Sequence, residues 1–269
     1  MYRRAAVRGA VARSTSLVIQ TILGFASTLV IAKALGAKGM GIVGFLGIIY
    51  SIYLVITGTS INRVIAKYIA EYKGREQEYM MVLSGSAMFR MLSSLFVFLL
   101  LLAFSKEVAA IGHIESPEII AWYATYLLLE GLGSYVASVL WGLGFLDHVS
   151  LYAIVANVVR SSLVIALVLH GLGIQGVVYG WTAGSLSYLV LCSRKSIREL
   201  KIALKRMPRY GFSGMKLILP LSSTVLVSGF FGRMVQFVDS VLVLGFLGIE
   251  ELGMYTLAVR IYTLGNNIA

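Results

Sequence analysis

Cysteine, histidine and charged residues are all scarce in this sequence. One cysteine and three histidines among 269 residues exclude an internal disulfide and a cysteine-based zinc site, and the histidines are too scattered for a metal cluster. No nucleophile, metal-ligand or phosphate-loop motif is present, and no RNA- or DNA-binding motif. The sequence therefore predicts neither an enzyme nor a bound cofactor nor a nucleic-acid partner.

The shortage of charge is uneven along the chain. Only 13% of the residues are charged, against about 25% in soluble domains, and residues 14–32, 39–62 and 171–193 contain no Asp, Glu, Lys or Arg. A membrane-spanning helix needs about 20 apolar residues. In lipid the span must be a helix or a closed barrel, and barrel strands alternate in polarity. These runs are continuously apolar, so the expected fold class is an all-α polytopic membrane protein.

The apolar runs divide the chain into one complete lobe and the start of another. Residues 1–193 are expected to form a six-helix lobe, residues 194–213 a basic cytoplasmic linker or interfacial helix, and residues 214–269 the first one to two helices of a second lobe. Helices are expected at 14–35, 40–62, 82–105, 118–146, 149–170, 172–193 and 214–246, with an eighth from about 252.

The basic residues predict the orientation of these helices. Three lie in segments on the outer side, namely Lys33, Lys38 and Lys106. Sixteen lie on the inner side when the N-terminus is inside: Arg3, Arg4, Arg8, Arg13, Arg63, Lys67, Lys73, Arg75, Arg194, Lys195, Arg198, Lys201, Lys205, Arg206, Arg209 and Lys216. Cytoplasmic loops collect Lys and Arg. We therefore expect a multi-pass protein of the cell (cytoplasmic) membrane with a cytoplasmic N-terminus, in contact with membrane lipids.

Two inner segments have helical character. Glu71 and Arg75 are four residues apart in the favourable order, so the helix at 40–62 is expected to extend through 63–79. Residues 194–209 carry an apolar stripe with basic residues beside it, which fits an interfacial helix on anionic lipid as well as a linker between two bundles. The stripe comprises Ile197, Leu200, Leu204 and Met207.

The chain contains an internal repeat with an offset of 212 residues. The offset spans six expected helices, so both copies have the same orientation in the membrane. Parallel repeats of this kind occur in transporters. The matching pairs are Phe25 and Phe237, Leu35 and Leu247, Gly36 and Gly248, Gly41 and Gly253, Ile49 and Ile261, and Tyr50 and Tyr262.

Three stretches carry a family resemblance. "KALGAKGMGIVGFLGIIYSIYLVITGTSINRVIAKYIAEY" (33–72), "GLGIQGVVYGWTAG" (171–184) and "FVDSVLVLGFLGIEELGMYTLAVRI" (237–261) resemble polysaccharide and O-antigen flippases of the multidrug, oligosaccharidyl-lipid and polysaccharide exporter superfamily. The resemblance implies alternating access by two lobes. It also implies a lipid-linked oligosaccharide as cargo, carried on a polyprenyl phosphate or pyrophosphate, in polysaccharide biosynthesis.

The chain departs from that family because it stops within its eighth helix. The resemblance therefore implies a further partner, either a missing C-terminal lobe or a second copy of the chain. Two other functions stay open at this point. One is a cation-coupled multidrug or metabolite antiporter of the same superfamily, and the other is an inactive, truncated membrane protein.

Charged residues inside the expected spans are the candidate site. Burying one at the bilayer centre costs at least ~2.5–3.5 kcal/mol, so it usually faces a partner or a cavity. At 1.5 Å rise per residue, Glu130 and Arg160 lie at equal depth, as do Asp239 and Arg260. One interpretation is that each pair is a structural ion pair between packed helices. Alternatively, the arginines bind an anionic cargo and the carboxylates couple transport to H⁺ or Na⁺. The candidates are Arg90, Arg160, Arg233 and Arg260 for substrate, with snorkelling as an alternative for Arg90, and Glu130 and Asp239 for the ion.

Overall fold

The computed structural model describes residues 2–58 and 61–268, and in these residues it is built of α-helices without a strand. This confirms the all-α fold expected for a polytopic membrane protein. The helices are α1 (Tyr2–Ile56), α2 (Ile61–Glu71), α3 (Glu76–Ala103), α4 (Ser105–Ile111), α5 (Pro117–Gly142), α6 (Leu146–Leu169), α7 (Gly173–Lys195), α8 (Ile197–Phe246) and α9 (Ile249–Ile268).

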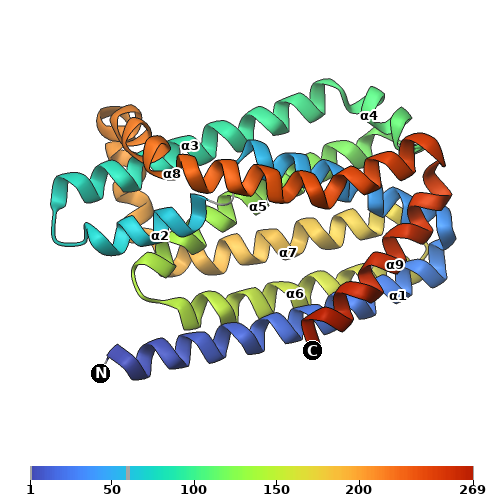
Figure 1. Ribbon diagram of the computed structural model, residues 1–269, viewed down its shortest axis with the longest axis horizontal. Helices are drawn as coiled ribbons and strands as arrows, with labels where there is room; N and C mark the ends of the chain where they lie inside the picture. Colours follow the sequence, from blue (N-terminus) through green and yellow to red (C-terminus); the bar gives the residue numbers. More distant parts are fainter. Residues whose placement is uncertain (1, 59–60, 269) are drawn as a thin grey trace.

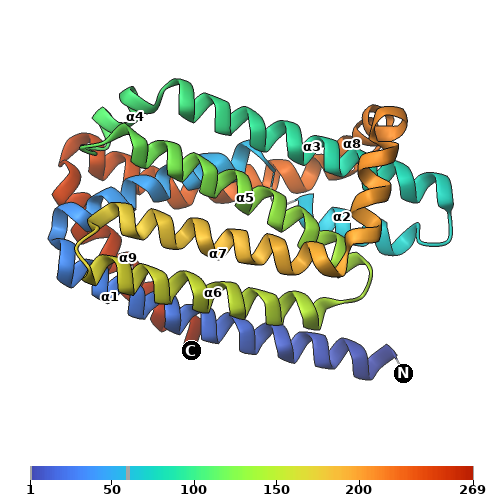
Figure 2. The ribbon, with the colours of Figure 1, turned by 180° about the vertical axis from the view of Figure 1, so that it is seen from behind.

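The long helices lie side by side in one bundle (Figures 1 and 2). The N-terminus, α2 and the α2–α3 turn lie at one end of the bundle, and α4 and the α8–α9 turn lie at the other (Figure 1). Among the described residues, three segments are long and apolar enough to cross a membrane by length and composition: Arg13–Glu71, Glu76–Ala103 and Leu146–Leu169. The segments rich in Lys and Arg, namely the N-terminus, residues 63–75 and residues 194–216, lie at the end of the bundle that holds the N-terminus (Figure 1).

Two glycines mark the repeat in the backbone. Gly36 divides α1 into two helices, with φ 64° and ψ −163°. Its repeat partner Gly248 has φ 114° and separates α8 from α9. Glycine adopts positive φ without the steric penalty of a side chain. The chain therefore turns at the same point in both copies of the repeat.

The helix expected at 40–62 is shorter than predicted, and its extension through 63–79 is wrong. α1 ends at Ile56, and Gly58 has φ 56°, in the left-handed region. The Ile61 backbone N–H donates to the Gly58 carbonyl at 2.8 Å where α2 begins. A glycine in this conformation ends the helix, and α2 starts as a separate, shorter element.

The segment expected as a linker or interfacial helix is the first part of α8. Residues 197–246 form one helical element that contains Pro208 and Pro220. Its first part runs in a different direction from the rest (Figure 1). Proline inside a helix removes a hydrogen bond and clashes with the preceding turn, which bends the helix.

The four residues of the apolar stripe in this segment divide between the protein core and the exposed surface. Leu200 and Met207 pack against the protein core, whereas Ile197 and Leu204 are 56% and 55% exposed. Ala203, which the stripe omitted, is 1% exposed. The face buried against the protein is therefore centred on Ala203, because α8 packs against α3.

Close helix contacts hold the first lobe together. Gly176, Gly180 and Gly184 of α7 face α6, and a Cβ atom on Gly180 would lie 2.8 Å from the backbone nitrogen of Val164. Small residues at this spacing let two helices approach each other. This glycine face of α7 thus packs against α6.

Candidate substrate-binding cavity

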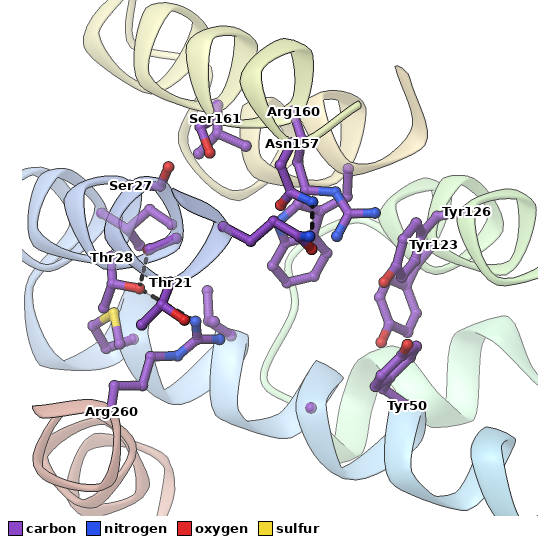
Figure 3. A pocket seen from close by; sticks show the side chains of 18 of the residues that line it. Thr21, Ser27, Thr28, Tyr50, Tyr123, Tyr126, Asn157, Arg160, Ser161 and Arg260 are labelled. Carbon is purple, nitrogen blue, oxygen red and sulfur yellow. Dashed lines mark hydrogen bonds between the residues drawn. The ribbon is translucent and has the colours of Figure 1, made fainter. Parts of the chain in front are cut away.

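A cavity of about 440 Å³ lies between α1, α5, α6, α7 and α9. Figure 3 shows its labelled side chains pointing toward one another from different helices. Two arginines and no Asp or Glu line it in the described part of the chain. The polar lining residues are Gln20, Thr21, Ser27, Thr28, Tyr50, Tyr123, Tyr126, Asn157, Arg160, Ser161 and Arg260.

Arg160 lines the cavity from α6, and residues of α5 and α7 bind its guanidinium. Its Nη2 atom lies 3.2 Å from Glu130 Oε2 and donates to Ser185 Oγ at 3.0 Å. The Ser185 hydroxyl donates to the same Glu130 oxygen at 2.6 Å. The contact expected from equal depth is therefore present. Since no described group binds Nη1, this edge of the guanidinium remains a donor toward the cavity.

The glycine face of α7 sets the position of Arg160. A Cβ atom on Gly184 would lie 2.6 Å from the Cβ of Arg160 and 3.0 Å from its Nε. No other residue type fits there unless Arg160 moves. The guanidinium lies 5.7 Å from the centre of the Tyr126 ring, within the range of a cation–π contact.

Arg260 reaches the cavity from α9, in the second lobe. Its Nη1 atom donates to Thr28 Oγ1 at 3.3 Å. The predicted pair with Asp239 is wrong, because Asp239 Oδ2 instead accepts a hydrogen bond from the Tyr255 hydroxyl at 3.3 Å. α9 packs along α1, so Arg260 faces α1 and not Asp239 on α8.

Arg90 does not line the cavity. It is 0% exposed, and its Nη2 atom donates to Asn62 Oδ1 at 2.6 Å. Its Nε and Nη1 atoms are buried without a hydrogen-bond partner among the described residues. Full burial inside the protein excludes snorkelling to the interface. The side chain of Arg233 lies outside the described residues.

Sequence reasoning missed the aromatic side of the cavity. Tyr123 and Tyr126 on α5 have ring centres 5.4 Å apart, and Tyr126 lies 5.7 Å from Trp181 and 6.2 Å from Tyr50. The three-residue spacing of Tyr123 and Tyr126 puts both on one helix face. That spacing was the available signal, but it is the same for tyrosines that anchor a helix at the membrane surface.

Metal binding finds no support in the described residues. They contain no group of three or more His, Cys, Asp or Glu side chains that could hold an ion. Cys192, the single cysteine, is buried. The chemistry of this cavity is therefore that of guanidinium, hydroxyl and amide groups and aromatic rings.

Comparisons with known proteins agree with this architecture. Residues 6–269 match the family described as polysaccharide biosynthesis protein. No curated protein sequence matches the chain significantly. The fold is similar to that of a MOP superfamily transporter from Pyrococcus furiosus, with 16% identity and a TM-score of 0.59 over 98% of this chain and 64% of that one.

A second solved structure shows the same fold. It is the outward-facing conformation of a multidrug resistance MATE family transporter of the MOP superfamily, with 16% identity and a TM-score of 0.56 over 98% of this chain and 64% of that one. The chain thus spans less than two thirds of either structure. With the MOP fold and a match over nearly its whole length, the chain belongs to the polysaccharide biosynthesis protein family.

Proposed function

We propose that this protein is a flippase that moves a lipid-linked oligosaccharide across the cytoplasmic membrane by alternating access. The described chain supplies the first lobe and the start of the second, and a further C-terminal lobe or a second copy completes the transporter. The end of the bundle that carries the basic segments faces the cytoplasm. The cargo is a sugar linked to a polyprenyl phosphate or pyrophosphate.

One observation carries this proposal. Arg160 of the first lobe and Arg260 of the second line the same cavity, and no carboxylate shares the described lining. Guanidinium groups bind phosphate oxygens through paired, charge-assisted hydrogen bonds. Because one arginine comes from each lobe, an anion bound between them contacts both repeats, which is where two-lobe transporters hold their cargo.

The remaining lining suits a sugar. Hydroxyl and amide groups on α1 and α6, among them Thr21, Asn157 and Ser161, share the lining with the clustered rings of Tyr126 and Trp181. Aromatic rings offer flat apolar surfaces, and the tyrosine hydroxyls and the tryptophan N–H also form hydrogen bonds. A cavity with both features accommodates a group that has many hydroxyls and apolar ring faces.

The ion-coupling role falls to Glu130 in this proposal. Its carboxylate holds Arg160, so H⁺ or Na⁺ bound to Glu130 weakens the ion pair and frees the guanidinium for cargo. Asp239 is not part of the cavity lining and contacts Tyr255. The geometry therefore supports Glu130, and not Asp239, as the coupling carboxylate.

A multidrug antiporter is the second candidate, since one similar structure is a multidrug resistance transporter. The aromatic cluster would suit an organic cation. However, Arg160 and Arg260 would repel a cation in the same cavity. The charge of the lining therefore favours an anionic cargo over a cationic drug.

Complementation tests the proposal. The complete gene is expressed in cells that lack their own flippase for a lipid-linked sugar, and surface polysaccharide is measured. Arg160→Gln and Arg260→Gln should each abolish the polysaccharide at unchanged protein abundance. Lys106→Gln, at an exposed residue of α4, is the matched control and should have no effect. Full activity of either arginine variant, or loss of resistance to a cationic drug instead of polysaccharide, would overturn the proposal.

A further inference from the structure

A second cavity lies nearer the end of the bundle that holds the N-terminus. It has a volume of about 350 Å³ and lies between α1, α2, α5, α6 and α7. We call it the inner cavity and the one with Arg160 and Arg260 the central cavity. Two arginines also line the inner cavity, Arg13 from α1 and Arg63 from α2. Neither has an ion-pair partner within the described part of the chain.

The inner cavity has a fixed polar wall. Arg13 lies over the ring of Trp141 on α5, 4.9 Å from its centre. Asn62 lies beside Arg63, and its Oδ1 atom accepts the 2.6 Å hydrogen bond from the fully buried Arg90. Because the Asn62 oxygen accepts the hydrogen bond from Arg90, Asn62 can offer the cavity its amide N–H₂ group, which is a donor. The buried Arg90 thus acts as a positioning residue for this cavity.

A wall of amide side chains separates the two cavities. Gln20 and Leu17 line both. Gln20 Oε1 accepts a hydrogen bond from Asn157 Nδ2 at 3.0 Å, and Gln20 Nε2 donates to Ser16 Oγ at 2.7 Å. The bond from Asn157 ties α6 to α1 at the boundary, and the bond to Ser16 holds the Gln20 side chain within α1.

The ion pair crosses the same boundary. Arg160 lines the central cavity, whereas its partner Glu130 lines the inner cavity. An anion arriving in the inner cavity therefore approaches Glu130 before it reaches Arg160. Repulsion from Glu130 opposes further entry until the carboxylate is neutralised or the amide wall opens.

We propose that the inner cavity is a second binding site, which takes up a phosphate or diphosphate group through Arg13, Arg63 and the Asn62 amide before the central cavity receives it. The inference rests on the proposed function for its direction and its cargo. The chemistry is that of a tetrahedral oxyanion between guanidinium and amide donors. A free diphosphate and the head group of a diphosphate lipid share this chemistry.

Tryptophan fluorescence distinguishes the two cavities. Trp141 lines the inner cavity and Trp181 the central cavity, and Trp122 lines neither. The Trp122→Phe/Trp181→Phe variant of the purified protein therefore reports on the inner cavity, and the Trp122→Phe/Trp141→Phe variant on the central cavity. Each is titrated with inorganic pyrophosphate and, separately, with geranylgeranyl diphosphate in mixed micelles. The first probe tests the free anion and the second the lipid head group.

The expected result is a saturable change in Trp141 emission with at least one probe. Arg63→Gln should weaken this binding about tenfold, as expected for the loss of one charge-assisted contact, and should leave the Trp181 response unchanged. Because Arg63 is exposed, its replacement does not disturb the core. Lys67→Gln, at an exposed position of the same helix, is the matched control. Arg13→Lys, which keeps a cation over Trp141 but loses the guanidinium fork, should also weaken binding.

Two results would overturn the inference. One is a Trp181 response without any Trp141 response, which would leave a single anion site and the proposed function intact. The other is a Trp141 response that Arg63→Gln and Arg13→Lys do not change. If Trp141 responds and Trp181 does not, the inner site stands and the proposed function fails. The two proposals are therefore tested independently.

Discussion

Gly41 and Gly253 occupy equivalent positions of the two repeats and lie against each other where α1 meets α9. A Cβ atom on Gly253 would lie 2.8 Å from the backbone nitrogen of Gly41. Gly41 also lies against the Ile249 carbonyl, and Gly253 against the Ala37 carbonyl. Ala37 and Ile249 are themselves repeat partners. The contact is thus reciprocal, as across a twofold axis, where each side offers the same surface.

The first prediction concerns this contact. Gly41→Ala or Gly253→Ala places a methyl group against the opposite backbone and should lower stability by about 1–3 kcal/mol, as for other overpacked sites. Thermal unfolding in detergent measures the effect. Gly245→Ala on α8 is the control, because nothing lies within 4 Å of its Cβ position. Equal midpoints for Gly41→Ala and Gly245→Ala would contradict the contact.

The second prediction separates the two roles of Arg160. Glu130→Gln and Arg160→Gln each leave a partly buried charge unpaired, since the side chains are 23% and 26% exposed. The double variant should therefore lose less stability than the single losses added together, with a coupling of about 0.5–3 kcal/mol. Transport should remain absent in the double variant, because the cavity still lacks its guanidinium. Recovered transport would show that Arg160 is only an ion-pair partner.

The third prediction compares the two carboxylates. Asp239→Asn should leave transport largely intact, because this side chain is exposed and hydrogen-bonds to Tyr255 outside the cavity. Glu130→Gln removes the charge that holds Arg160 and should abolish coupling to H⁺ or Na⁺. Transport is measured in vesicles with and without an imposed ion gradient. A gradient response that survives Glu130→Gln but not Asp239→Asn would reverse the assignment.

The fourth prediction is the orientation. Single cysteines at Lys106 and Lys201 in a Cys192→Ala background are probed with a membrane-impermeant thiol reagent added outside intact cells. Lys106→Cys should react, and Lys201→Cys should react only after the membrane is opened. The physical reason is that Lys and Arg collect on the cytoplasmic side. The opposite labelling pattern would place the N-terminus outside.

Depth along a helix could be predicted from the sequence, but the direction of a side chain could not. Residue counting put Glu130 level with Arg160, and these two meet because α7 brings α5 and α6 together. The same arithmetic put Asp239 level with Arg260, yet these two do not meet. The rise per residue determines the depth of a residue in the membrane, whereas the direction in which its side chain points depends on how its helix packs against its neighbours.

The candidate site was predicted in part for the same reason. Arg160 and Arg260 stood out as charges within apolar spans, and both line the cavity. Arg90 stood out equally, but it is fully buried beside Asn62. The tyrosines of the cavity were missed because an aromatic residue in a membrane helix has several common roles, and only packing distinguishes them.

The contact between α3 and α8 determines where the lobes can move. Gly214 of α8 lies so close to Gly85 of α3 that its Cβ position is 2.9 Å from the Gly85 Cα, and neither position has room for a side chain. This close contact between α8 and α3 holds the start of the second lobe against the first lobe. In the proposed alternating access, a swivel between the two halves would then lie beyond Gly214. Pro220, which lacks a backbone N–H, lies inside α8 shortly after that contact. Under the proposed alternating access, the first turns of the second lobe are therefore expected to move together with the first lobe.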